Sequence, residues 1–337
     1  MTETSVVVSR VGHLGRLHLN RPKALNSLTL EMVRLLQAGL SEFEDDDGIA
    51  SVMITGEGTR AFCAGGDIIA LFNAADGNEA EASTFWSEEY DLNARIASYP
   101  KPYIAVMDGI TMGGGVGVSV HGSHRIVTER TKFAMPEAGI GLFPDVGGTW
   151  VLGKKTAGEM GTYIGMTGEV LKAGDAISAG LADSYMSSDT LPALISALAE
   201  STDRGAVTRS IDALSGVSPA SVIDQNRVAI DATFAHDTVE DIIAALTSLK
   251  TDFAKTTLAT LAQKSPSSLK MTLALLRAGR GSHNLRQCLD RELGAVIQMF
   301  GQPDFREGVR AAVIDKDRNP KWVPKELAEV SVPTFEI

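Results

Sequence analysis

The chain has 337 residues, of which 44% are hydrophobic and 22% charged, and these values exclude a disordered or fibrous protein. With 42 acidic and 31 basic side chains the formal net charge is −11, which argues against a nucleic-acid partner because such partners require a basic surface. No apolar run approaches the roughly 18 residues of a membrane span, and two cysteines are too few for a disulfide scaffold.

The first half of the chain alternates short strands, glycine-rich loops and helices. Two strands are predicted between Val6 and Leu19, followed by a helix with Ser27 as its N-cap. Apolar runs predict further strands at 51–55 and 103–107, and helical spacing predicts a helix at 83–98. This repeated order of strand, loop and helix predicts an α/β core.

Beyond about residue 155 the pattern becomes helical. Residues 191–200 and 239–249, for example, carry the apolar spacing of amphipathic helices. We therefore expect an α/β core at 1–190 and a mainly helical region at 191–337.

Glycine is over-represented, with 33 residues, about 10% of the chain against a typical value of about 7%. Two clusters, RAFCAGGD at 60–67 and MGGGVGVSVHG at 112–122, lie where a strand gives way to a helix. Glycine permits close backbone approach there, and the following helix presents unpaired N–H groups. Two such loops converging on one carbonyl oxygen would form an oxyanion hole. The alternative is that the glycines serve only tight turns and helix packing.

One serine and two histidines are weaker candidates. Ser119 lies in a near match to the GxSxG nucleophile motif, but His121 replaces the final glycine, and packing within a helix is the competing interpretation. His121 and His124 have no cysteine or carboxylate at metal-ligand spacing, so no metal site is expected.

Two acidic residues stand out in PEAGIGLFPDVGG at 136–148. Glu137 and Asp145 lie beside apolar residues, and a carboxyl group desolvated in this way has a raised pKa, which suits a general base or a nucleophile. The competing interpretation is that Glu137 caps a turn and that Asp145 caps a helix beginning near Val146.

These segments together resemble the crotonase, or enoyl-CoA hydratase/isomerase, superfamily, and within it the group of 3-hydroxyisobutyryl-CoA hydrolases. The likeness covers nearly the whole chain. It rests on LNRPKALNSLT at 19–29, RAFCAGGD, FWSEEYDLN at 85–93, YPKPYIAVMDGITMGGGVGVSVHG at 99–122, FAMPEAGIGLFPDVGG at 133–148 and EGVRAAVIDKDRNPKW at 307–322. The resemblance implies a core of repeated ββα units with a helical C-terminal region, and an acyl-CoA thioester as substrate.

The resemblance also implies roles for five residues, all of which would contact the substrate. Gly66 and Gly114 would supply the two N–H groups of the oxyanion hole. Glu137 would be the catalytic glutamate, and Asp145 a second acid of the active site. Glu89 would be a further residue of the substrate site.

Hydratases that resemble this chain carry a second catalytic glutamate where Gly117 stands. Because glycine is neither acid nor base, we expect hydrolysis, with (S)-3-hydroxyisobutyryl-CoA of valine breakdown as the leading substrate. Glu137 would either attack the thioester carbonyl or activate a water molecule. The alternatives are an enoyl-CoA hydratase or isomerase, and an acyl-CoA-binding protein without turnover.

We expect the acyl-CoA substrate as the partner, and no cofactor besides the CoA that is part of it. The resemblance also allows a homo-oligomer, and the sequence leaves the oligomeric state open. Basic side chains outnumber acidic ones between 270 and 321, which predicts a surface for the CoA phosphates. A mixed, solvated helical surface is the competing interpretation. Few cysteines and the start MTETSVVVS, which resembles neither a signal nor a transit sequence, predict a cytoplasmic location.

Overall fold

The computed structural model describes residues 4–75, 77 and 79–331. The chain divides into two compact units, unit 1 with residues 1–67, 87–133 and 171–222, and unit 2 with 68–86, 134–170 and 223–337. The predicted domains, a core at 1–190 and a mainly helical region at 191–337, stay a prediction; these units group residues by contact instead. Residues 191–222 belong to unit 1 and residues 134–170 to unit 2, because each segment makes most of its contacts with residues of that unit.

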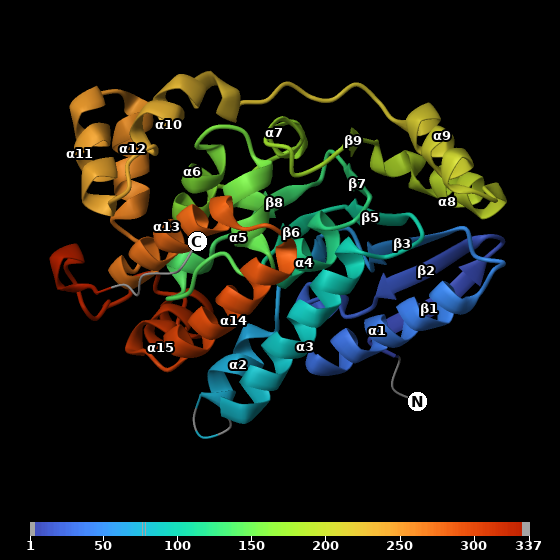
Figure 1. The fold of residues 1–337 in the computed structure, drawn as a ribbon, viewed down its shortest axis with the longest axis horizontal. Helices are drawn as coiled ribbons and strands as arrows, with labels where there is room; N and C mark the ends of the chain where they lie inside the picture. The colour runs from blue at the N-terminus through green and yellow to red at the C-terminus, as the bar shows by residue number, and fades with distance from the viewer. Residues whose placement is uncertain (1–3, 76, 78, 332–337) are drawn as a thin grey trace. The chain divides into compact units, whose positions relative to one another are not determined.

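Unit 1 is built on a six-stranded sheet in the order β1-β2-β3-β5-β7-β9 (Figure 1). β1 and β2 pair antiparallel, and the other pairs in this sheet are parallel. The strands are β1 (Val6–Val11), β2 (Leu14–Leu19), β3 (Ser51–Gly56), β5 (Tyr103–Met107), β7 (His124–Val127) and β9 (Ser184–Tyr185).

A second sheet has three strands in the order β4-β6-β8, namely β4 (Ala61–Cys63), β6 (Ile110–Met112) and β8 (Lys132–Ala134). Each of them directly follows a strand of the large sheet, and a helix follows β4 and β6. This order confirms the predicted core of repeated ββα units. Both glycine clusters lie at a junction from the small sheet to a helix.

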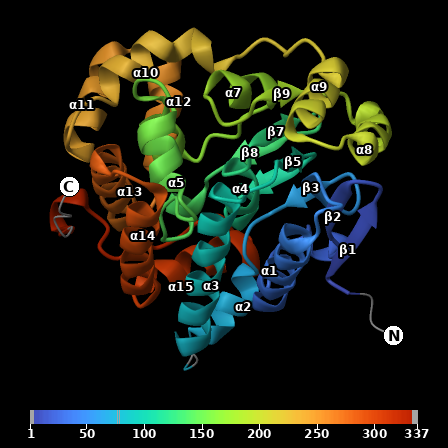
Figure 2. The same ribbon diagram turned by 45° about the vertical axis from the view of Figure 1, so that its right-hand side comes forward.

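Helices cover both faces of the large sheet. α8 (Leu191–Glu200) and α9 (Arg204–Leu214) bury their apolar side chains against strand residues such as Leu14 and Met53. α1 (Leu30–Asp45) lies alongside β1 and β2 (Figure 2). Since strand side chains alternate between faces, Leu17 points toward α1 while Leu14 points toward α8. The remaining helices within unit 1 are α4 (Gly114–Val120) and α7 (Ala173–Ser178).

α1 begins two residues later than its predicted cap would place it. Its N-cap is Thr29, whose hydroxyl accepts a hydrogen bond from the Met32 N–H, so the prediction of Ser27 is wrong. The reason lies in the preceding residue: the Leu28 N–H donates to the Gly65 carbonyl at 2.8 Å, and the Asp67 N–H donates to the Leu28 carbonyl at 2.8 Å. Leu28 is thus extended, and it braces the first glycine loop.

Unit 2 is mainly helical, and α3 (Glu79–Ala97) runs from it into unit 1. Its helices are α2 (Ile68–Ala74), α5 (Gly148–Trp150), α6 (Met160–Thr167), α10 (Arg227–Thr233), α11 (Val239–Leu249), α12 (Asp252–Leu261), α13 (Pro266–Gly281), α14 (Leu285–Phe300) and α15 (Pro303–Val309). The predicted helices 191–200 and 239–249 are confirmed as α8 and α11. Within the described ranges, no helix has the length and apolar character needed to cross a membrane.

The approach of α4 to β4 depends on Gly115. A Cβ placed there would lie 2.2 Å from the Cys63 carbonyl oxygen, so Gly115→Ala forces two backbone segments apart. We expect it to lower the free energy of unfolding by about 1–3 kcal/mol, measured by urea denaturation. Gly294→Ala is the matched control, because a Cβ at this exposed helical position meets no atom within 4 Å and should stabilise by about 0.5–1 kcal/mol. Equal stability of the two variants would contradict this account.

Candidate active site

The two glycine loops of unit 1 come together at Gly66 and Gly114. Gly66 follows β4, and Gly114 is the first residue of α4. A Cβ placed on Gly114 would lie 3.2 Å from the backbone nitrogen of Gly66. The loop before Gly66 requires glycine, because Gly65 has a φ of +106°. The structure therefore brings together the two residues predicted to form the oxyanion hole.

Glu89 belongs to the same group of residues. It lies on α3, is buried, and places its Oε1 atom 2.3 Å from the Cβ position of Gly114. A side chain at position 114 would therefore collide with this carboxyl group. Glu89 lies beside Gly114, as its predicted membership of the substrate site requires, and the role itself stays a prediction.

The acidic pair lies in unit 2. Glu137 begins a short 3₁₀ turn, η2 (Glu137–Gly139), after β8, and its side chain is 6% exposed. Burial raises the pKa of Glu137 well above its ordinary value, the charge of Asp145 raises it further, and Lys264 opposes both. Within the described part of the chain, Glu137 Oε2 has no hydrogen-bond partner. The group is thus a desolvated carboxyl near a second acid, as predicted.

Asp145 lies at the start of a turn with unusual backbone. Val146 and Gly147 both have positive φ, +53° and +78°. The helix predicted to begin near Val146 begins instead at Gly148, because these two left-handed residues delay it. The N–H groups of Gly147 and Thr149 donate to the carboxylate of Glu292 on α14.

Sequence reasoning missed Lys264 and Glu292. Glu292 carries a signal that could have found it, since it stands among the apolar residues that α14 buries, a position where an acid requires an explanation. Lys264 precedes the N-cap of α13 and shows no comparable pattern in the sequence. Its pKa is lowered by burial, while Glu137 and Glu169 act in the opposite direction.

A basic cavity of about 520 Å³ opens in unit 2 and includes Lys264. The residues that line it are Ala262, Gln263, Lys264, Pro266, Arg318, Asn319, Pro320, Lys321, Trp322 and Lys325. Four of them are cationic and none is acidic. In the described ranges, none of these four cations forms an ion pair with an acidic side chain. The indole N–H of Trp322 donates to the Gln263 carbonyl at 3.1 Å and closes one wall.

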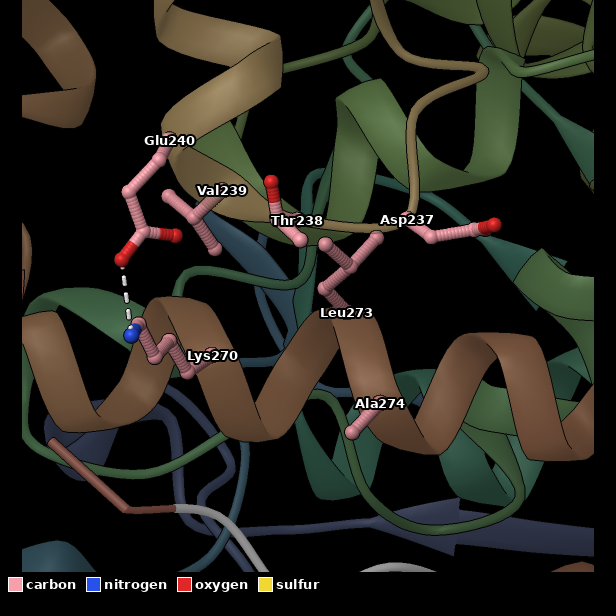
Figure 3. A pocket seen from close by; sticks show the side chains of 7 residues that line it. All are labelled: Asp237, Thr238, Val239, Glu240, Lys270, Leu273 and Ala274. Atoms are coloured by element: carbon pink, nitrogen blue, oxygen red, sulfur yellow. Dashed lines mark ion pairs between the residues drawn. The ribbon is translucent and has the colours of Figure 1, made fainter.

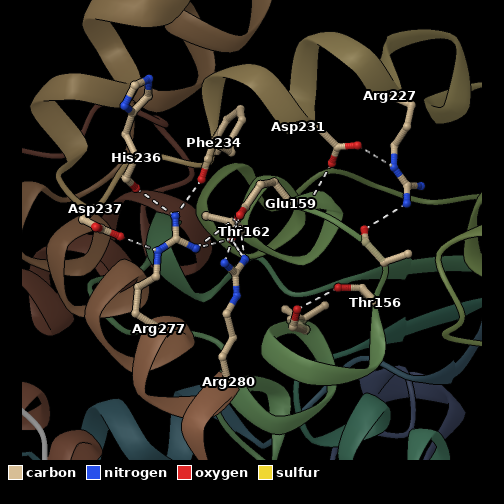
Figure 4. A network of polar contacts seen from close by, with 12 residues as sticks. Thr156, Glu159, Thr162, Arg227, Asp231, Phe234, His236, Asp237, Arg277 and Arg280 are labelled. Carbon is tan, nitrogen blue, oxygen red and sulfur yellow. Dashed lines mark hydrogen bonds and ion pairs between the residues drawn. The ribbon is translucent and has the colours of Figure 1, made fainter. Parts of the chain in front are cut away.

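The three cations of α13 are paired with acidic side chains. Lys270 lies 2.8 Å from Glu240 beside a small cavity of about 170 Å³ (Figure 3). Arg277 and Arg280 converge on Glu159, at 3.1 and 2.5 Å, and Figure 4 shows the network around them. On α13 the competing interpretation, a mixed helical surface, is therefore the better description. The four cations that line the basic cavity differ from these three, since they have no acidic ion-pair partner in the described ranges.

The weaker candidates have structural explanations. Ser119 is fully buried in α4, and its hydroxyl donates to the Gly115 carbonyl at 2.7 Å, which confirms helix packing as its role. Cys63 and Cys288 are buried free thiols, and burial raises the pKa of Cys63 to about 12. Among the residues that the structure describes, no three His, Cys, Asp or Glu side chains are grouped so as to hold a metal ion.

Comparison with known proteins gives consistent results for the family. The sequence model of the family described as enoyl-CoA hydratase/isomerase matches residues 14–336. A relative from Xenopus laevis, named 3-hydroxyisobutyryl-CoA hydrolase, mitochondrial, is 42% identical over 332 residues, covering 96% of this chain and 86% of the relative. The human protein of the same name is 39% identical and covers 97% and 86%.

Solved structures confirm the predicted fold. A structure titled carnitinyl-CoA dehydratase, from Mycobacterium thermoresistibile, superimposes with a TM-score of 0.92 at 42% identity, covering 98% of this chain and 94% of that one. An enoyl-CoA hydratase from Rhodobacter sphaeroides gives 0.90 at 40% identity, covering 97% and 95%.

The prediction of a cytoplasmic location is contradicted, because the curated relatives are named as mitochondrial proteins. The cysteine count separates reducing from oxidising compartments, and it does not distinguish one reducing compartment from another.

The family assignment rests on agreement over almost the whole length of the chain. The family match begins in β2 and includes both glycine loops, the acidic pair and the basic cavity. Two relatives at about 40% identity and two structures with TM-scores of 0.90 or more support it independently. The chain therefore belongs to the enoyl-CoA hydratase/isomerase family.

Proposed function

We propose that the chain hydrolyses a short β-hydroxyacyl-CoA thioester, 3-hydroxyisobutyryl-CoA, to 3-hydroxyisobutyrate and CoA, as a step of valine catabolism. Curated relatives at 39–42% identity carry the name of this hydrolase. The observation that carries the proposal is which acidic side chains are present in the candidate site and which are absent. The buried pair of Glu137 and Asp145 is present, whereas α4, with Gly117, has no acidic side chain.

The N–H groups of Gly66 and Gly114 polarise the thioester carbonyl in this proposal. Their backbones approach closely, and neither carries a side chain that would exclude a substrate oxygen. A preorganised donor of this kind is worth about 2.7–4 kcal/mol of transition-state stabilisation, judged from the loss of one such donor in a protease. Backbone donors suit this task because they need no reorganisation when negative charge develops on the oxygen.

Glu137 supplies the reacting carboxylate by one of two routes. It attacks the thioester carbon, which expels the CoA thiolate and leaves an anhydride that water then cleaves. Alternatively, it takes a proton from water, and the hydroxide attacks the carbon directly. Both routes consume one water and release one carboxylic acid and one thiol, and neither needs a further cofactor. Asp145 orients the substrate hydroxyl, the water or the leaving thiolate.

The basic cavity is the proposed place for the phosphates of CoA. Lys264, Arg318, Lys321 and Lys325 supply four cations without an acidic neighbour in the lining. Phosphate oxygens accept charge-assisted hydrogen bonds from such groups. Trp322 adds an aromatic surface beside them. This local charge explains how a chain with a net charge of −11 can bind an anionic substrate.

Hydration of an enoyl-CoA is the second candidate function. The titles of the two similar solved structures, a dehydratase and a hydratase, favour it. The glycine at position 117 argues against it. A non-catalytic acyl-CoA-binding protein is less favoured, because both glycine loops and Glu137 are present. A homo-oligomer stays a prediction.

Release of CoA thiol from (S)-3-hydroxyisobutyryl-CoA, followed with a thiol reagent, tests the proposed function. We expect turnover by the wild-type protein, and loss of at least about a thousandfold in Glu137→Gln with substrate binding retained, since the amide can neither attack nor take a proton. Hydration of an enoyl-CoA without thiol release would establish the second candidate. Binding without either reaction would establish the non-catalytic protein.

The pH dependence of thiol release reports the pKa of Glu137. Only its ionised form reacts, so kcat/KM should rise with pH up to the raised pKa of Glu137. Asp145→Asn removes a negative neighbour of Glu137 and should therefore move the rising limb of the kcat/KM profile to lower pH. Lys264→Met removes a positive neighbour and should move it to higher pH. Shifts of the same sign in both variants would contradict the assignment of the limb to Glu137.

Substrates with and without the nucleotide test the basic cavity. Arg318→Ala combined with Lys321→Ala should raise KM for the CoA thioester about tenfold, or about 1.4 kcal/mol, and leave KM for the matching pantetheine thioester unchanged. Arg286→Ala is the control, since this exposed cation on α14 pairs with Asp290 at 2.7 Å outside the cavity. An equal rise for both substrates would place the phosphates elsewhere.

A further inference from the structure

The turn that carries Asp145 is held in a backbone conformation that side chains disfavour. Val146 has a φ of +53°, which is a steric outlier for a β-branched residue, and Gly147 follows at +78°. Conformations of this kind cost on the order of 1–3 kcal/mol and persist only where surrounding contacts enforce them. One contact is local, since the Gly148 N–H donates to the Asp145 carbonyl at 2.6 Å.

Three further hydrogen bonds of the turn come from one side chain that is distant in the sequence. Glu292 Oε2 accepts a hydrogen bond from the Gly147 N–H at 2.7 Å, and Glu292 Oε1 accepts one from the Thr149 N–H at 3.0 Å. The Thr149 hydroxyl also donates to Glu292 Oε1. Three donors on both sides of Gly148 therefore converge on one carboxylate.

Glu292 is placed for this task at a cost in free energy. It is fully buried on α14, and burial raises its pKa to about 8, while the hydrogen bonds from Thr149 and Gly147 oppose the shift. The charge of Asp145 raises the pKa further, so the two acids are near enough to interact. Burial raises the pKa of Cys288, one turn earlier on α14, and the charge of Glu292 raises it further. An apolar residue would fill this helix face without the free-energy cost of desolvating a charge. The presence of an acid here therefore indicates that its hydrogen bonds serve a function.

We propose that Glu292 is a positioning residue for the reaction: it holds the left-handed turn at Val146 and Gly147, and thereby fixes the carboxyl group of Asp145. In this role Glu292 acts through the N–H groups of Gly147 and Thr149 and through the Thr149 hydroxyl. Only the expected effect on kcat rests on the proposed function. The anchoring of the turn stands on the hydrogen bonds themselves.

Steady-state kinetics of thiol release distinguish positioning from a purely structural role. Above pH 8, where the Glu292 carboxyl is ionised, Glu292→Gln keeps the shape but places an amide N–H₂ against one backbone donor. We expect kcat to fall about 10- to 100-fold, as for a misplacement of about 1 Å, with KM within about threefold of wild type. Asp290→Asn is the matched control, since it removes an exposed carboxylate from the same helix and should leave both constants unchanged.

A double-mutant cycle with Asp145→Asn tests whether Glu292 acts through Asp145. If it does, Glu292→Gln should reduce kcat little further in the Asp145→Asn background. Thr149→Val, which removes the third donor, should lower kcat in the same direction, and Thr149→Ser should restore it. Multiplicative losses in the double variant, or a wild-type kcat in Glu292→Gln, would overturn the proposal.

Amide hydrogen exchange gives a readout that does not depend on activity. The N–H groups of Gly147 and Thr149 should be protected in the wild-type protein and exchange at least about tenfold faster in Glu292→Gln, with protection of α11 unchanged as evidence of an intact fold. Unchanged protection at both positions would overturn the anchoring. Absence of thiol release by the wild-type protein would instead refute the proposed function, and the exchange result would still decide whether Glu292 anchors the turn.

Discussion

The burial of carboxyl groups in unit 2 is the constraint on which the candidate site depends. Glu137, Asp145, Glu292 and Asp304 are all at most 7% exposed. An ionised carboxylate removed from water costs several kcal/mol unless hydrogen bonds or opposite charges compensate it. Glu292 receives three donors and Asp304 two, whereas Glu137 Oε2 has no partner among the described residues. The fold thus satisfies Glu292 and Asp304 with hydrogen bonds, whereas one oxygen of Glu137, the candidate catalytic acid, has no such partner in the described part of the chain.

Elements defined by local pattern could be predicted from the sequence, and elements defined by distant contacts could not. The bounds of β5, α8 and α11 follow from apolar spacing and from the capping residues or prolines that flank them. The start of α1 does not, because Leu28 pairs with the glycine loop nearly 40 residues later and delays the helix to Leu30. The division into units likewise depends on contacts between segments that are distant in the sequence, which local patterns do not show.

The same distinction applies to the candidate site. Glu137 and Asp145 lie eight residues apart in one motif, and each glycine loop is a contiguous segment, so sequence reasoning could name them. Glu292 meets its turn across more than 140 residues, and only its place in an apolar helix face hints at a function. Arg318 and Lys321 lie in the segment predicted to be basic, but the cavity also needs Lys264 and Lys325 from outside it.

Asp304 has a consequence that reaches beyond its own surroundings. One of its oxygens accepts from the Ser265 hydroxyl at 2.5 Å, and the other accepts from the Val323 N–H at 2.7 Å. The Ser265 N–H in turn donates to the Ala138 carbonyl, next to Glu137. Hydrogen bonds of Asp304 and Ser265 therefore hold both the C-terminal wall of the basic cavity and the turn that begins at Glu137. Through Asp304 and Ser265, the segment that forms this wall and the segment that carries Glu137 are joined by hydrogen bonds although they are far apart in the sequence.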